Sequence, residues 1–137
     1  MPSHEESEVR AQIEALAHAI RAKNVAQVLT HYAENVVTFD VMPPLQVRGA
    51  PAYQKNFEAW FGAMRGPMSF EVVELAVAAE QSLAVCHYLA HVTGTWEESG
   101  EPADYWVRAT SSFRKHGGRW SIVHEHVSVP QNPPARS

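Results

Sequence analysis

The N-terminal part of the chain carries the apolar spacing of helices. Between residues 9 and 20 the apolar side chains recur every three or four positions, which places them on one helical face. They are Val9, Ile13, Leu16 and Ile20. Ser3, three residues ahead of Glu6, has the spacing of a capping box at the start of this helix. A second capping signal at Asn24 predicts a short helix through Val25, Val28, Leu29 and Tyr32.

A β-type run and a third helix follow. Residues 36–40 (VVTFD) predict a strand, and the next segment, VMPPLQVRG, interrupts regular structure. Pro51 suits the first turn of a helix. The face of that helix is strongly aromatic, with Tyr53, Phe57, Trp60, Phe61 and Met64.

The rest of the chain has the pattern of strands. Four β-type runs, at about 68–80, 83–96, 103–115 and 119–130, are joined by short turns, which favour antiparallel pairing. Helices followed by strands are typical of the α+β class. We therefore expect one domain over residues 1–137, with a core at about 8–130 and a tail at 131–137. A long curved sheet wrapped on an aromatic helix is expected to enclose a cavity.

Composition narrows the choice of partners. The chain has 137 residues and a formal charge of −4, so it lacks the basic surface of a nucleic-acid-binding protein. Cys86 is the only cysteine, which excludes an internal disulfide or a cysteine metal cluster. The N-terminus is polar and acidic, unlike a secretion signal, and no apolar run approaches the length of a membrane span. We expect a cytoplasmic protein without membrane contact.

The stretches HYAENVVTFDVMPPLQVRGAPAY, SGEP and GGRWSIVHEHVSVP, in this order, resemble the SnoaL-like branch of the nuclear transport factor 2-like superfamily. This resemblance, over residues 8–130, implies a ketosteroid isomerase-like cone, also described as a cystatin-like roll. In it three N-terminal helices pack on a strongly curved antiparallel sheet around an open pocket. It also implies a homodimer that forms through the sheet. Members include enzymes and non-enzymatic transport factors, so function has to be argued from the site.

The resemblance to ketosteroid isomerase tests one activity. The carboxylate base of that enzyme aligns with Asp40, but its two oxyanion-hole positions fall on Leu16 and near Ala109, which cannot donate hydrogen bonds to an enolate. Steroid isomerisation is therefore disfavoured. Limonene epoxide hydrolase needs an Asp-Arg-Asp set, for which Asp40 and Arg108 lack a third member.

Three residues are candidate catalytic groups: Asp40, His91 and Glu125. Asp40 is either a base at the cavity mouth or a cap of the turn that follows it. A histidine at position 91 can act as acid or base near neutral pH, or can be held by a backbone carbonyl. The superfamily comparison suggests that its face of the strand looks inward.

Aromatic and apolar side chains form the candidate pocket wall, which suits a small, flat, partly apolar ligand. The candidate substrate-binding residues are Phe39, Tyr53, Phe57, Trp60, Trp106, Arg108 and Val127. Arg108 is either an anion contact or a surface cation that pairs with Asp104.

The last strand places His124 and His126 on one face and Glu125 on the other. The superfamily comparison puts Glu125 and Val127 on the pocket side. Alternation alone leaves the opposite orientation open, and one β-bulge exchanges the two faces. Two histidines at this spacing are a weak metal pattern, so we expect neither a metal nor another cofactor.

Two functions remain after this reading. The first is a pocket that binds a small organic molecule and performs cofactor-independent isomerisation, dehydration or cyclisation by acid–base chemistry. The second is a non-catalytic ligand-binding or homo-oligomeric assembly domain, which the incomplete catalytic set favours.

Overall fold

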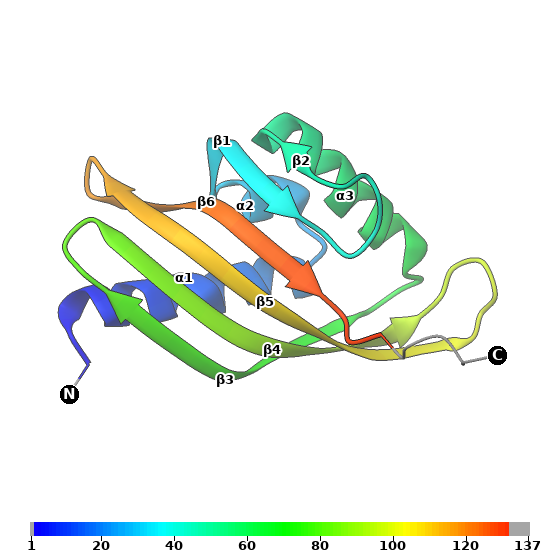
Figure 1. Ribbon diagram of the computed structural model, residues 1–137. Helices are drawn as coiled ribbons and strands as arrows, with labels where there is room; N and C mark the ends of the chain where they lie inside the picture. Colours follow the sequence, from blue (N-terminus) through cyan, green and yellow to red (C-terminus); the bar gives the residue numbers. More distant parts are fainter. Residues whose placement is uncertain (1, 132–137) are drawn as a thin grey trace, which may run out of the picture.

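A computed structural model describes residues 2–131 of the chain. Three helices and six strands follow one another, with the strands gathered in one sheet (Figure 1). The helices are α1 (His4–Arg21), α2 (Val25–Leu29) and α3 (Ala50–Ala63). The strands are β1 (Tyr32–Phe39), β2 (Val47–Arg48), β3 (Ser69–Ala79), β4 (Leu83–Thr95), β5 (Pro102–His116) and β6 (Arg119–Ser128). The predicted α+β class is confirmed.

The helix signals of the sequence mark the observed helix ends. The hydroxyl of Ser3 accepts a hydrogen bond from the Glu6 amide at 3.1 Å, and the side chain of Asn24 caps α2 in the same way. The expectation that Tyr32 belongs to the second helix is wrong. That helix ends at Leu29, and Tyr32 opens β1, where its side chain is drawn into the core.

The sheet has the strand order β2-β1-β6-β5-β4-β3. The predicted antiparallel pairing holds for the four long strands β3 to β6. Two features differ from the prediction. The pair β1–β6 is parallel, because β1 enters the sheet from the helices rather than through a hairpin. The segment expected only to interrupt regular structure contains the short strand β2, which pairs with β1.

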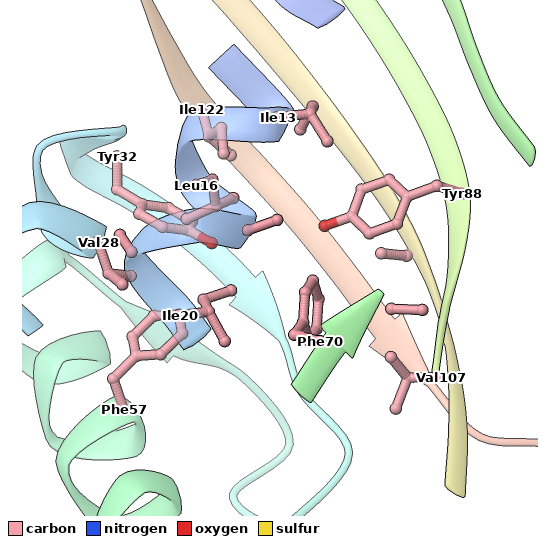
Figure 2. Packing of buried hydrophobic residues seen from close by; sticks show 14 of the residues in the cluster. Ile13, Leu16, Ile20, Val28, Tyr32, Phe57, Phe70, Tyr88, Val107 and Ile122 are labelled. Atoms are coloured by element: carbon pink, nitrogen blue, oxygen red, sulfur yellow. The ribbon is translucent and has the colours of Figure 1, made fainter. Parts of the chain in front are cut away.

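The two faces of the sheet have different surroundings. All three helices lie on one side of it, here called the inner face, and the opposite side, the outer face, carries no helix (Figure 1). Side chains of β4 alternate accordingly: Ala84, Cys86, Tyr88, Ala90 and Val92 are buried on the inner face, and the residues between them are more exposed. Figure 2 shows side chains from α1, α3 and the strands meeting in this core.

A register shift in β6 sets which residues face inward. Phe113 of β5 pairs with Ile122, but the preceding Ser112 pairs with His124, so Val123 is an extra residue in β6. Before this bulge Trp120 and Ile122 are buried on the inner face; after it Glu125 is buried there. The bulge thus places Glu125, rather than the two histidines, on the side of the helices.

Candidate active site

A row of polar side chains crosses the inner face of the sheet. The strand register aligns Thr38 of β1 with Glu125 of β6, Glu125 with Ser111 of β5, and Ser111 with Cys86 of β4. All four side chains are buried, and Glu125, at 3 % exposure, is the only charged residue among those described that is classed as buried. A buried carboxylate in an otherwise apolar core needs hydrogen-bonding partners.

Glu125 obtains these partners from three hydroxyl groups. The hydroxyls of Tyr32 and Tyr53 donate to its Oε2 at 2.7 and 3.0 Å, and the Ser111 hydroxyl donates to its Oε1 at 2.9 Å. The donors come from β1, α3 and β5, so three elements hold one carboxylate. The Tyr32 and Tyr53 rings also meet edge to face, with centroids 5.2 Å apart, which fixes both hydroxyls over Glu125.

Burial changes the acidity of this cluster. Removal from water raises the pKa of Glu125, the hydrogen bonds from Tyr32, Ser111 and Tyr53 oppose this rise, and the charge of Asp40 adds to it. Burial and the charge of Glu125 raise the pKa of Tyr32 and of Tyr53 well above 10, so both remain hydroxyl donors at neutral pH. Burial also raises the pKa of the Cys86 thiol to about 12, which leaves it an unreactive thiol.

One further hydroxyl on the inner face has no partner among the described residues, and a second belongs to Tyr88. The Thr38 hydroxyl is fully buried and makes no hydrogen bond within the described part of the chain. Tyr88 of β4 is 5 % exposed on the same face, where burial and the charge of Glu125 raise the pKa of its hydroxyl. In Figure 2 the hydroxyls of Tyr88 and Tyr32 point toward one another from opposite sides of the core.

Asp40 lies half-buried directly after β1, at the rim of this region. Its carboxylate accepts hydrogen bonds from the Val41 amide at 2.7 Å and from the Asn56 side chain of α3 at 3.0 Å. The first of these bonds is to a backbone amide of the turn that follows, as expected for the turn cap that is the alternative to a catalytic base. Its charge nevertheless adds to the raised pKa of Glu125, Tyr53 and Tyr105.

Part of the candidate pocket wall belongs to the same core as Glu125. Tyr53 and Phe57 of α3 are buried, and their rings lie 4.8 Å apart. Trp60 is half-buried, and its indole donates a hydrogen bond to the Tyr105 hydroxyl at 3.0 Å. Val127 lies on the inner face, opposite Ala109.

The other candidates lie on the outer face and do not join this group. His91 bonds Asp104 at 2.7 Å and stacks on the Trp106 ring, with centroids 4.5 Å apart. Arg108 donates to the Ser128 hydroxyl at 2.9 Å. Phe39 is also on this side. The comparison that suggested an inward-facing His91 gave the wrong side of β4, because buried Cys86, Tyr88 and Ala90 occupy the inner face.

The two histidines of β6 accompany Phe39 on the outer face. Nδ1 of His124 lies 2.7 Å from the Val37 carbonyl oxygen, to which it donates a hydrogen bond, since a carbonyl oxygen can only accept. The Phe39 ring meets the rings of His124 and His126 edge on, with centroids 4.8 and 5.5 Å apart. The described residues contain no group of three or more histidine, cysteine or acidic side chains that could hold a metal ion.

The sequence does not indicate Tyr32, Thr38 and Ser111 as residues of the site. Its helical spacing places Tyr32 in a helix, and neither of the two small hydroxyl residues belongs to a recognisable motif. The sequence contains one signal for Ser111. It lies between Ala109 and Phe113 in a series of alternate positions that share one face of the strand, and its two apolar neighbours in that series are buried. No local signal identifies Thr38, because it lies beside Glu125 only through the pairing of β1 with β6.

Two surface hollows of the described residues lie away from Glu125. One is lined by the end of α3 and residues 96–99, and the other by α1, residues 30–31 and the β5–β6 turn. Around Glu125 the inner face is packed with core side chains. None of the described helices is long and apolar enough to cross a membrane.

Comparison with known proteins places this arrangement in a family. A SnoaL-like domain model matches residues 9–132, nearly the whole chain. The chain belongs to the SnoaL-like domain family. A nuclear transport factor 2-like protein of unknown function from Pseudomonas putida KT2440 is 35 % identical, with a TM-score of 0.82 over 93 % of this chain and 87 % of that one. A search of curated proteins finds no significant match.

More distant structures share the fold of this SnoaL-like domain. A ketosteroid isomerase-like protein from Erwinia carotovora atroseptica is 17 % identical, with a TM-score of 0.81 over 96 % of this chain and all of the other. A nuclear transport factor 2-like protein with a cystatin-like fold from Novosphingobium aromaticivorans is 14 % identical, with a TM-score of 0.77 over 91 % and 81 % of the two chains. Both support the predicted cone architecture.

Proposed function

We propose that this SnoaL-like domain binds a small, partly apolar organic molecule on the inner face of its sheet and performs acid–base chemistry on it. Glu125 transfers the proton, and Asp40 at the rim is the second carboxylate. The observation that carries the proposal is the burial of Glu125, with its raised pKa, among hydroxyl groups from three elements. Carboxylates whose pKa is raised toward neutrality are suited to accept and return protons.

The hydrogen bonds suit such a role. Tyr32, Tyr53 and Ser111 fix the carboxylate in one orientation, as a base needs if it is to reach one particular proton. Glu125 is 3 % exposed, so a substrate reaches it only when neighbouring side chains of the inner face move. Isomerisation, dehydration and cyclisation through an enol share one first step, removal of a proton next to a carbonyl group.

That shared step can be tested before the substrate is known. The protein is incubated in D₂O with a panel of small cyclic and aryl ketones, and loss of the α-proton NMR signal is followed. We expect exchange with at least one ketone, and a loss of roughly 100-fold or more in Glu125→Gln. Asp40→Asn should reduce exchange less than Glu125→Gln, because Asp40 lies at the rim.

Two results would count against the proposal. Exchange that is no faster than in buffer with any ketone opposes the acid–base role. Equal exchange by the wild type and Glu125→Gln shows that the base lies elsewhere. Circular dichroism and thermal unfolding of each variant distinguish a lost base from a lost fold.

A second candidate function is a non-catalytic assembly domain. It is favoured by the outer face, where apolar side chains are exposed without a helix to cover them. It is also consistent with a Glu125 carboxylate that already accepts three hydrogen bonds from protein hydroxyls. In this alternative Glu125 orders the core, and association of two copies through the outer face is the function.

A further inference from the structure

The buried hydroxyl of Thr38 has no structural task that the described residues reveal. Its side chain is fully buried on the inner face, with Val47 of β2 and Glu125 of β6 as its register partners. Its hydroxyl makes no hydrogen bond to the Glu125 carboxylate or to any other group of residues 2–131. A buried hydroxyl without a partner costs stability, and valine would fill the same space without that cost.

The carboxylate beside Thr38 has acceptor capacity left. Oε2 of Glu125 accepts two hydrogen bonds, from Tyr32 and Tyr53, whereas Oε1 accepts only one, from Ser111. A carboxylate oxygen offers about two lone-pair directions. Glu125 Oε1 can therefore accept one more bond, and the neighbouring Thr38 hydroxyl can donate one.

We propose that Thr38 is a ligand-binding residue that, together with Glu125, holds a hydroxyl group of the ligand. An alcohol, phenol or enol hydroxyl can donate to Glu125 Oε1 and accept from Thr38 Oγ1 at once. A ketone only accepts and an ammonium only donates, so neither satisfies both groups. This inference rests on the proposed ligand-binding function and adds to it the chemical class of the bound group. Thr38 is then kept at a cost in stability because it contributes to binding.

The test uses 4-fluorophenol as the probe and fluorobenzene, which lacks the hydroxyl, as the control, with binding followed by ¹⁹F NMR. The wild type should bind 4-fluorophenol more tightly than fluorobenzene. Thr38→Val should weaken binding of 4-fluorophenol roughly five- to tenfold and leave binding of fluorobenzene unchanged. Thr38→Ser, which keeps the hydroxyl, should bind 4-fluorophenol within about twofold of the wild type.

Thermal unfolding provides a second measurement, in which Thr38→Val is expected to do as well as or better than the wild type although it binds the phenol more weakly. Thr38→Val should keep or raise the melting temperature, by about 2–5 °C, because it removes an unpartnered buried hydroxyl. Thr38→Ser should lower it, because it removes a buried methyl group. The variant that binds poorly is thus expected to be the more stable one, which a purely structural role of the hydroxyl does not produce.

Three outcomes overturn the inference: wild-type protein that binds 4-fluorophenol no better than fluorobenzene, Thr38→Val that binds it as the wild type does, or a clear loss of stability in Thr38→Val. Its failure is separable from that of the proposed function. A protein that exchanges ketone protons through Glu125 but binds 4-fluorophenol independently of Thr38 contradicts only this inference. A protein that binds the phenol through Thr38 but exchanges no protons contradicts only the proposed catalysis.

Discussion

At the scale of single residues, Glu125 is the most unusual group of the molecule. It is a carboxylate within a core of aliphatic and aromatic side chains, and its position costs free energy that three hydrogen bonds offset. Its three donors are hydroxyls rather than cations, so no opposite charge favours its ionised form. Burial can therefore raise its pKa despite three hydrogen bonds.

The raised pKa of Glu125 makes stability depend on pH in a defined direction. The pKa of Glu125 is near 4.5 in the unfolded chain and higher in the folded protein. The folded protein therefore keeps the Glu125 proton to a higher pH. Between these two values the folded state binds more protons, so the free energy of unfolding falls as pH rises, and it levels off above the folded-state pKa. Glutamine at position 125 does not titrate. The stability of Glu125→Gln relative to the wild type should therefore increase as pH rises from about 4.5.

Urea unfolding between pH 4 and pH 8 measures this difference. Glu58→Gln, at an exposed position of α3, is the control for loss of one negative charge. If the free energy of unfolding of Glu125→Gln, relative to the wild type, changes with pH no more than that of Glu58→Gln, burial does not raise the pKa of Glu125.

At the scale of elements, the strand β6 decides what the site contains. Strict alternation from the buried Trp120 and Ile122 would turn His124 and His126 inward, and the extra residue Val123 reverses this. The sequence predicts that these histidines and Glu125 lie on opposite faces, but which face is inner depends on the bulge. A bulge follows from the pairing of β5 with β6 and has no marker in the residues around Val123.

Elements with local sequence signals could be predicted, and features that depend on strand pairing could not. The helix α1 and the four long strands are evident because apolar periodicity and turns are local signals. Tyr32 fits a helical spacing after Val28 equally well, and the strand is favoured by contacts distant in sequence, its pairing with Ile122 and its hydrogen bond to Glu125, 93 residues away. Glu125 itself stands out as a charged residue in an apolar strand. Thr38 and Ser111 join it through strand register, which sequence periodicity does not contain.

The two histidines of β6 should differ in their importance for stability. His124 is half-buried and donates to the Val37 carbonyl of the neighbouring strand, whereas His126 is exposed and shares with it only the contact to Phe39. We expect His124→Ala to lower the free energy of unfolding by about 1–2 kcal/mol and His126→Ala by less than about 0.5 kcal/mol. Urea unfolding at two protein concentrations measures both and separates effects on association. Equal losses in the two variants would contradict this assignment.

At the scale of the whole molecule, the sheet is covered on one side only. The helices lie on the inner face (Figure 1). Exposed apolar side chains remain on the outer face. These side chains are Phe39, Leu83, Val85, Leu89 and Trp106. Two pairs of polar groups between them are joined within the chain, His91 with Asp104 and Arg108 with Ser128. A face of this kind can be buried against a partner without leaving many polar groups unsatisfied.

A second copy of the chain is the partner we expect on the outer face. Two identical sheets related by a twofold axis would bury both sets of apolar side chains, and Leu89, near the middle of the face on β4, would be covered. Leu89→Glu should weaken the dimer by at least about 100-fold, because a buried unpaired carboxylate opposes association. Leu45→Glu is the matched control: Leu45 is 95 % exposed in the loop after β1 and should leave the dimer intact. Sedimentation equilibrium at micromolar concentrations measures both variants. A monomeric wild type, or a Leu89→Glu dimer as tight as the wild type, would show that two copies do not associate through this face.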